Sequence, residues 1–357
     1  MVAGSTNATA EGRRVQERPL VSIVIPNYNY ADVLGRCLAA ATTQTYPDVE
    51  VLLVDDCSTD NSVAVASRYP CRVLRTPANG GEAGARNLGV EHARGDVLFF
   101  LDSDLVLRPG AVEKAVAMLD ADPSVGCVYG IYEKTPLTAA GLVKDYRTLQ
   151  AHYWRVSSLG DADAGFFSIA ALRRSVWDQV GPFKPIRVGE EMDYGARVAR
   201  VTRAVLTDEV RGLHDDEEGM PRLLRKLYLR AQVRIPFGFE QGKFAHADET
   251  GSRILAALLG AGVLVSAPLG LVRPALSGVA LGQLAGFVLL DRGMYAFVWR
   301  ERRSVPFLVS FVGLHLCCSG VVVAGGAVGL ARWLASPRYR RMFATAERPA
   351  PGPEVRA

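Results

Sequence analysis

The chain has 357 residues, of which 41 are Lys or Arg and 37 are Asp or Glu, and 49% are hydrophobic. This length suits about two folding units, and the composition excludes a disordered chain, a collagen-like repeat and a disulfide scaffold. A formal net charge of +4 is too small to indicate a nucleic-acid partner. The mean hydropathy is +0.12 although 22% of the residues are charged, so the apolar residues must be unevenly distributed.

Short β-rich runs alternate with helical stretches from residue 20 to about residue 130. The predicted strands are nearly continuous in apolar residues, as in strands covered on both faces. They are Leu20–Pro26, Val49–Asp55, Arg72–Arg75 and Val97–Asp102. The predicted helices are Ala31–Gln44, Asp60–Arg68, Ala83–Ala93 and Pro109–Asp120. This alternation predicts βαβ units and a Rossmann-like, mostly parallel sheet flanked by helices.

The pattern is weaker from residue 131 to residue 250. We expect a strand at Gly165–Ala170 and helices at Leu172–Val180 and Gly189–Arg200. Met220–Val233 has apolar residues at helical spacing with Arg and Lys between them, which predicts an amphipathic helix. Residues 1–18 have no apolar core between their charges, so we expect a disordered lead and not a signal peptide.

The apolar excess lies in residues 253–334. Ile254–Val272 is uncharged over 19 residues, enough to span a hydrocarbon core of about 30 Å. Ala275–Leu290 is also apolar, and after an Asp-Arg pair Gly293–Trp299 continues it. Val305–Ala331 is uncharged over 27 residues. We therefore expect a membrane region of two to three hydrophobic helices, followed by a basic, Pro-rich tail at residues 335–357.

The topology of this region stays open. One basic cluster precedes the last apolar segment and another follows it: Arg300, Arg302 and Arg303, then Arg332, Arg338, Arg340 and Arg341. Both clusters favour the cytoplasmic side, but a single crossing between them would separate them. The six cysteines are scattered and form no Cys-x-x-Cys pair, which indicates reduced core residues and a cytoplasmic location for the catalytic part.

Polar residues follow three of the predicted strands. These are Asn27 to Asn29, then Asp55 and Asp56, then Asp102 to Asp104. Ligands bind outside the carboxyl ends of the strands in such sheets, so the three groups should meet at one edge. The last group is an Asp-x-Asp, whose two carboxylates can hold a divalent cation that bridges to a diphosphate.

Several motifs occur in a fixed order along the chain. They are Ser22–Asn29 (SIVIPNYN), Val54–Asp60 (VDDCSTD), Asn79–Gly81, Ala85–Gly89 (ARNLG), Phe100–Asp104 (FLDSD), Gly181–Phe183 and Gly189–Asp193 (GEEMD). With these motifs, residues 19 to 214 resemble a membrane-anchored, inverting family 2 glycosyltransferase of GT-A fold. We therefore expect a GT-A catalytic domain over residues 19–250 that ends in the amphipathic helix.

The resemblance implies a site for a nucleotide sugar, usually a UDP-sugar. Its residues would be Pro26, Tyr28, Asn29, Asp55, Asp56, Asn79, Arg86, Asp102 and Ser103. Tyr28 would stack on the base, Asp56 would hydrogen-bond it, and Arg86 would lie near the diphosphate. Asp104 would bind Mg²⁺ or Mn²⁺, with Asp102 and His214 beside it.

The resemblance also implies a catalytic base at the start of a helix. Relatives carry Glu-Asp there, whereas this chain has Glu190-Glu191. Glu191 matches the base position, but its side chain is one methylene longer, so either glutamate could reach the acceptor. The alternative is a charge pair that only stabilises the helix N-terminus.

Other motifs narrow the function. Asp161 and Asp163 form a second Asp-x-Asp, but no long apolar strand precedes it, which favours a polar turn. There is no GxGxxG or P-loop motif, which excludes a dinucleotide or P-loop site. The Gln-x-x-Arg-Trp of processive synthases is absent, and Arg230 to Arg234 is the nearest stretch. Transfer of a single sugar is therefore favoured over polymerisation.

Taken together, the sequence predicts an inverting, metal-dependent glycosyltransferase at the cytoplasmic face of the inner membrane. Its acceptor would be a polyprenyl phosphate, a lipid-linked saccharide or a glycolipid, which a membrane-tethered enzyme meets at high local concentration. Three alternatives stay open: a polysaccharide synthase or export component, a non-catalytic nucleotide-sugar-binding membrane module, and a sugar nucleotidyltransferase. The last would need a Gly-rich basic loop after the first strand, where this chain has Pro26 to Asn29.

Overall fold

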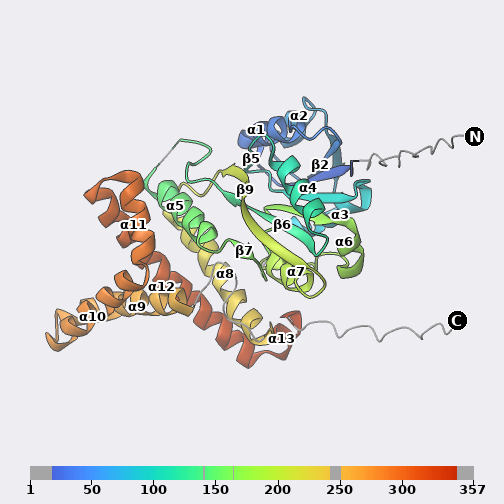
Figure 1. Ribbon diagram of the computed structural model, residues 1–357. Coiled ribbons are helices and arrows are strands. Elements are labelled where there is room, and N and C mark those ends of the chain that lie inside the picture. Colours follow the sequence, from blue (N-terminus) through green and yellow to red (C-terminus); the bar gives the residue numbers. More distant parts are fainter. Residues whose placement is uncertain (1–17, 140, 164, 242–250, 344–357) are drawn as a thin grey trace, which may run out of the picture.

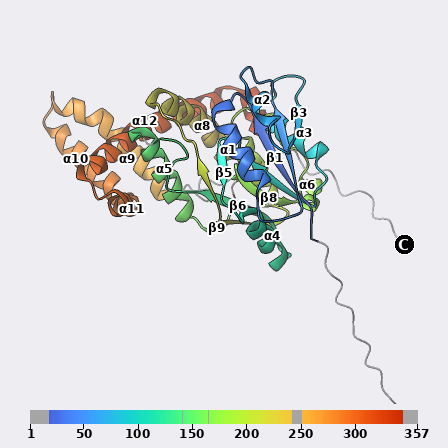
Figure 2. The same cartoon turned by 90° about the horizontal axis from the view of Figure 1, so that it is seen from above.

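The computed structural model describes residues 18–139, 141–163, 165–241 and 251–343. Almost all of the expected lead, and residues 344–357 of the expected tail, lie outside the described residues. Figures 1 and 2 show a sheet domain with helices on both faces, and a group of C-terminal helices that extends to one side of it.

A nine-stranded sheet forms the centre of the first domain, in the order β3-β2-β1-β4-β8-β6-β9-β5, with β7 paired to β9. The strands are β1 Val21–Asn27, β2 Val49–Asp55, β3 Arg72–Arg75, β4 Val97–Leu101, β5 Leu105–Leu107, β6 Val125–Tyr132, β7 Gly160–Asp161, β8 Ile169–Arg173 and β9 Arg203–His214. β2 and β3 have the predicted bounds, whereas the strand expected at Gly165–Ala170 begins only at Ile169.

The sheet is mixed, and six of its nine strands, β3, β2, β1, β4, β6 and β9, run in the same direction, as expected of a mostly parallel sheet. β3, β2, β1 and β4 are parallel neighbours, as the βαβ pattern predicts. β8 runs antiparallel to both β4 and β6, and β5 and β7 run antiparallel to β9. The reason lies in the chain between β6 and β8, which passes through a helix and the short β7 and so returns β8 in the opposite direction.

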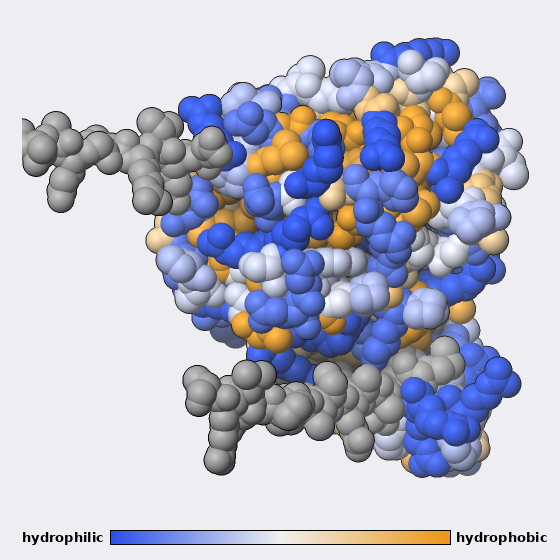
Figure 3. Space-filling view, turned by 90° about the vertical axis from the view of Figure 1, so that its right-hand side faces the viewer, coloured by the Kyte–Doolittle hydropathy of each residue, from blue (hydrophilic) through white to orange (hydrophobic). Residues whose placement is uncertain are grey.

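Helices cover both faces of the sheet. One face packs against α1 (Ala31–Thr42), α2 (Ser62–Ala66) and α4 (Ala111–Ala121). The other packs against α3 (Gly81–His92), α6 (Arg174–Val180) and α7 (Glu190–Val198). α4 begins after the predicted Pro109, because Gly110 precedes it with a positive φ of 81°. On the side seen in Figure 3, hydrophilic residues interrupt the hydrophobic surface of this domain.

Two longer helices join the sheet domain to the C-terminal helices: α5 (Leu142–Val156) and α8 (Met220–Gln241). The C-terminal helices are α9 Gly251–Gly270, α10 Ala275–Leu290, α11 Arg292–Arg302, α12 Val305–Ala335 and α13 Pro337–Phe343. By length and composition, α9 and α12 could each cross a membrane, and α10 with α11 would add a third span bent by 69°. The expected two to three hydrophobic segments are therefore helices.

A separate core lies between these two groups of helices. Tyr146 and Leu149 of α5 and Leu223 of α8 pack with residues of the C-terminal helices, among them Phe287 and Phe311. The C-terminal helices thus share a hydrophobic core with helices of the sheet domain.

Glycines allow α12 to approach α8 closely. A Cβ at Gly329 would lie 2.1 Å from the carbonyl oxygen of Gln232, and one at Gly325 would lie 2.5 Å from the carbonyl oxygen of Tyr228. Both neighbours are backbone atoms, which cannot rotate away. The small residues of α12 therefore set the distance between the two helices.

We predict that Gly329→Ala destabilises the protein, because the added methyl group overlaps the α8 backbone and overpacking costs roughly 1–3 kcal/mol. Gly313→Ala is the matched control in the same helix, since a Cβ there meets nothing within 4 Å. The control should be neutral or slightly stabilising, because Ala favours a helix over Gly. Thermal unfolding of both full-length variants in detergent measures the difference. Equal midpoints would contradict the close α8–α12 packing.

Candidate active site

The polar residues at the strand ends meet at one edge of the sheet, as expected. Asn29 has a positive φ of 59°, and its side-chain oxygen accepts a hydrogen bond from the backbone N–H of Thr59 at 2.7 Å. It therefore connects the loop after β1 to the loop after β2. The neighbouring Tyr28 is 47% exposed, which leaves its ring available to a ligand, whereas Pro26 is buried in β1.

The two aspartates after β2 are buried and hydrogen-bonded. Asp56 accepts from the hydroxyl of Thr76 at 2.7 Å and from the N–H groups of Gly80 and Gly81 at 2.9 and 2.8 Å. It thus holds the start of α3, in addition to any contact with a base. Asn79 donates to the carbonyl oxygen of Asp56 at 3.0 Å.

The companion aspartate, Asp55, lies 3.4 Å from the Asn27 amide nitrogen and forms a longer ion pair with Arg75 at 3.9 Å. The nucleotide-binding roles of these residues stay predictions, because no structural observation tests them.

Arg86 lies at the centre of the site and is fully buried. Its guanidinium contacts four carboxylates: Asp102 at 2.8 Å, Glu191 at 3.1 Å, Glu190 at 3.2 Å and Glu82 at 3.5 Å. These groups come from α3, from the end of β4 and from the start of α7. Arg86 therefore holds the first Asp of the Asp-x-Asp and both glutamates together, a contact set that the sequence did not predict.

Four carboxylates around one buried cation leave excess negative charge. Burial, opposed by the charge of Arg86, raises the pKa of Asp102 and of Glu190 well above the ordinary range of a carboxyl group. Glu82, Glu190 and Glu191 lie near enough to one another to hold a metal ion. The guanidinium of Arg86 already contacts all three, so it takes the place of such a cation.

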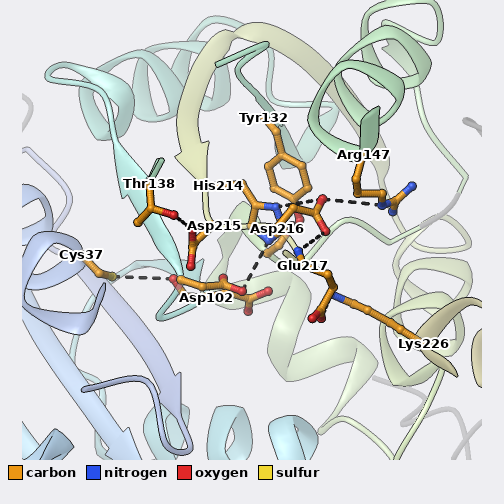
Figure 4. Close-up of polar contacts among 12 residues, drawn as sticks. Cys37, Asp102, Tyr132, Thr138, Arg147, His214, Asp215, Asp216, Glu217 and Lys226 are labelled. Atoms are coloured by element: carbon orange, nitrogen blue, oxygen red, sulfur yellow. Dashed lines mark hydrogen bonds and ion pairs between the residues drawn. The ribbon is translucent and has the colours of Figure 1, made fainter. Parts of the chain in front are cut away.

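The second Asp of the Asp-x-Asp faces His214. An oxygen of Asp104 lies 3.4 Å from Nε2 of His214, and Nδ1 of the same ring lies 3.4 Å from an oxygen of Asp216 (Figure 4). The ring also stacks on Tyr132 at 4.4 Å. Burial opposes the charged ring, but the two carboxylates outweigh it and raise the pKa of His214 to about 9.

The residues around Asp104 fit a divalent cation. Asp104 is buried, and its Oδ1 has no hydrogen-bond partner among the described residues. Burial favours its neutral form, but the neighbouring imidazole outweighs burial and lowers the pKa of Asp104, so the group is ionised. A bound ion would displace the proton from Nε2 of the charged His214 ring, and Asp216 on Nδ1 would orient Nε2 toward the ion, as outer carboxylates do for metal-bound histidines. Ser103, between the two aspartates, is buried.

Sequence reasoning missed the residues that surround this centre. Asp216 was not singled out, although an acidic run directly after His214 is a visible signal. Lys226 of α8 lies 3.3 Å from Glu217, as Figure 4 shows. Arg230 follows one turn later. Burial opposes the positive charge of Arg230, but the carboxylates of Glu191 and then Glu82 outweigh burial and raise its pKa. The packing of α8 brings these two cations to the site. The sequence around them therefore gives no sign of this position.

The second Asp-x-Asp is not part of this centre. Asp161 lies in the short β7, is exposed, and pairs with Arg203 at 2.6 Å on the surface.

Comparisons with known proteins agree with this arrangement. Residues 22–180 match the model of Glycosyl transferase family 2. This match covers less than half of the chain. The chain is 40% identical over 124 residues to a chondroitin synthase of Pasteurella multocida (strain Pm70), which covers 33% of this chain and 13% of the synthase. It is 35% identical over 111 residues to an uncharacterized glycosyltransferase of Haemophilus influenzae, which covers 31% of this chain and 38% of that protein.

The chain thus spans well under half the length of both relatives. A mannosyltransferase from Pyrobaculum calidifontis, solved in complex with GDP-Man and Mn2+, is similar over 90% of this chain and 89% of its own, with a TM-score of 0.56 and 18% identity. This likeness shows a shared GT-A fold.

We predict that Asp104→Asn weakens the binding of Mn²⁺ to the protein at least about tenfold, because it replaces a carboxylate that would hold the ion with a neutral amide. Asp161→Asn is the matched control, since it makes the same change in the surface Asp-x-Asp. Titration calorimetry with MnCl₂ on the full chain measures both affinities. Wild-type affinity in the Asp104 variant would remove that residue from the metal site.

We also predict that the metal-free protein loses stability as the pH rises from 6 to 9. Burial raises the pKa of Glu190 from 4.5 to about 8. The folded state therefore binds this proton more tightly than the unfolded chain, and the stabilisation is complete below pH 4.5 and lost as the pH rises through about 8. Asp102 and His214, whose pKa values are raised too, act in the same direction, so Glu190 carries only part of the dependence.

Glu190→Gln should flatten this dependence, measured as the thermal unfolding midpoint in EDTA. Glu91→Gln is the matched control, because it makes the same substitution at an exposed glutamate of α3. This variant should keep the wild-type dependence of the unfolding midpoint on pH. If the Glu190 variant loses stability as steeply as the wild type, the assignment of the proton to this cluster is wrong.

Proposed function

We propose that the protein is an inverting, metal-dependent glycosyltransferase that moves one sugar from a nucleotide sugar, with UDP as the nucleotide, to a lipid-linked acceptor. One observation carries the proposal. A single guanidinium nitrogen of Arg86 contacts both Asp102 at 2.8 Å and Glu191 at 3.1 Å. The carboxylate that faces the donor and the candidate base therefore belong to one preorganised centre.

The donor would lie across the edge formed by β1, β2 and β4. Tyr28 would cover the base with its exposed ring, while Asp104, Asp102 and His214 would hold the ion. A bound Mg²⁺ or Mn²⁺ would offset the negative charge that develops on the leaving diphosphate. Lys226 of α8 interacts with the charge of Asp104, and Arg230 with those of Glu191 and Glu82, so both would add positive charge to the site.

Glu191 would act as the base. Its side chain is 25% exposed, whereas that of Glu190 is 7% exposed, so Glu191 is the one of the two that can reach an acceptor. The acceptor hydroxyl would give its proton to Glu191 while its oxygen bonds to the anomeric carbon. The bond from that carbon to the diphosphate oxygen breaks at the same time, which inverts the configuration.

The acceptor proposal rests on the position of a cavity. A cavity of about 380 Å³ lies between the β6–α5 segment, α5 and α11, within the size range of small-molecule pockets. Its polar walls include two ion pairs, Lys134 with Glu301 at 2.9 Å and Arg302 with Asp145 at 2.7 Å. Because it adjoins the hydrophobic C-terminal helices, it supports an acceptor whose head group reaches the domain from a membrane. We propose that the sheet domain lies on the cytoplasmic side of the inner membrane.

A second candidate function is repeated transfer. The relatives from Pasteurella multocida are a chondroitin synthase and a hyaluronan synthase. The match covers 33% of this chain, so it supports the transfer step and leaves the number of transfers to experiment. Mass spectrometry of the product from purified protein separates the two, since one added sugar supports single transfer and a ladder supports a synthase.

We predict that Glu191→Gln lowers transfer about 10²- to 10⁴-fold while donor binding persists, because loss of a general base has this size of effect. The assay incubates the full chain in membrane-lipid vesicles with Mn²⁺ and a panel of UDP- and GDP-sugars, and measures labelled lipid. Glu82→Gln is the matched control, because Glu82 also contacts Arg86 but its side chain is 60% exposed. Near wild-type turnover in the Glu191 variant, or a product of retained configuration, would exclude this residue as the base.

A further inference from the structure

One face of α12 is buried from Phe311 to Gly329. Its buried residues recur at helical spacing: Phe311, His315, Cys318, Ser319, Gly325, Gly326 and Gly329. A stripe of exposed apolar and small residues runs along the opposite side: Val305, Val309, Gly313, Cys317, Ala324, Ala327, Ala331 and Leu334. A helix with this pattern has protein against its buried face and an apolar environment against its exposed stripe.

α5 covers the buried face near the start of α12, and Tyr295 of α11 and Phe287 of α10 cover His315 one turn further along. The ring of Tyr146, on α5, contacts Phe311 at 4.8 Å. Just before α12 begins, Arg302 pairs with Asp145 of α5 at 2.7 Å. α5 itself is anchored to the sheet, since Arg155 donates to the carbonyl oxygen of Gly130 in β6 at 3.1 Å.

α8 covers the second half in the same way. Gly329 lies directly against the backbone of Gln232, whose side chain accepts a hydrogen bond from Arg332 at 2.6 Å. α8 in turn lies against the sheet domain, because Gly189, at the start of α7, faces Val233 of α8. Both halves of α12 are therefore separated from the sheet domain by a single helix (Figure 1).

This arrangement conflicts with a helix that crosses a bilayer. α12 has 31 residues, and at 1.5 Å per residue it is about 46 Å long, against a hydrocarbon core of about 30 Å. If it crossed, one of its covering helices would enter the hydrocarbon with it. α8 carries the exposed Arg222 and Arg225, and an arginine is strongly disfavoured at the bilayer centre.

We infer that α12 does not cross the membrane but lies along the surface of one leaflet, with its exposed apolar stripe in the lipid and α5, α8 and the sheet domain on the water side. α5 and α8 supply the polar side that α12 lacks, so the three helices together are amphipathic. The basic clusters at the two ends of α12 then lie on the same side, which removes the conflict in the charge distribution. The active site then lies close to the lipid surface.

The test labels cysteines on the two ends of α12 in sealed vesicles that contain the full chain. Arg300→Cys and Arg338→Cys place thiols at exposed positions before and after the helix, and the native exposed Cys57 marks the side of the sheet domain. A membrane-impermeant maleimide is added outside, with and without permeabilisation, and the labelled peptides are identified by mass. We expect both thiols to react from the side that labels Cys57. Reaction of the two thiols from opposite sides overturns the inference.

A second measurement needs no new residue at the helix ends. Cys317 is exposed on the lipid-facing stripe near the middle of α12. A fluorophore on this thiol should be quenched most by lipids brominated near the head group, because a helix in the surface enters the lipid only about 5–10 Å. Strongest quenching by lipids brominated near the chain ends places this residue at the bilayer centre and overturns the inference. Neither readout depends on glycosyl transfer, so the proposed function stands or fails separately.

Discussion

The active centre depends on one buried arginine. Arg86 contacts carboxylates from three elements of the sheet domain, and it is the group that brings α3, the end of β4 and the start of α7 to one point. Without a counter-ion, these acids would repel one another in a buried space, and desolvation would make their charges costly. The arginine therefore permits a dense group of acids where a diphosphate and its metal ion would bind.

The same cluster explains how two neighbouring glutamates differ. Both stand at the start of α7, but Glu190 points inward to one guanidinium nitrogen and is buried, while Glu191 reaches the other and stays partly exposed. Burial favours the protonated form of Glu190, and access favours Glu191 as the proton acceptor. Environment and not residue type separates their roles, as in other enzymes with paired carboxylates.

The second constraint is the pair of helices α5 and α8. Each packs on the sheet domain with one side and on the hydrophobic C-terminal helices with the other. This double contact brings Lys226 and Arg230 to the acids of the active site, and it brings the cavity beside Lys134 to the same junction. In the proposed function, the lipid-linked acceptor and the nucleotide sugar would meet at this edge.

Local sequence was sufficient for the first half of the domain. The apolar runs of β1 to β4 and the helices between them follow the βαβ pattern closely, and the Asp-x-Asp at the end of β4 was found from its position alone. Local sequence was insufficient for β6, β8 and β9. Their pairing joins residues that are far apart in the chain, and some of these pairs are antiparallel. Hydropathy located the C-terminal helices but not their orientation, which depends on what covers each face.

The sequence by itself determined which chemical groups the protein has: an acidic strand edge, a glutamate pair at a helix start, and long apolar helices. These are local properties, fixed by residue type and spacing. Only the tertiary structure decided which groups touch. It placed Arg86 among the acids, left one oxygen of Asp104 unpartnered, and covered α12 with α5 and α8. Such contacts join segments distant in the chain, so no local pattern encodes them.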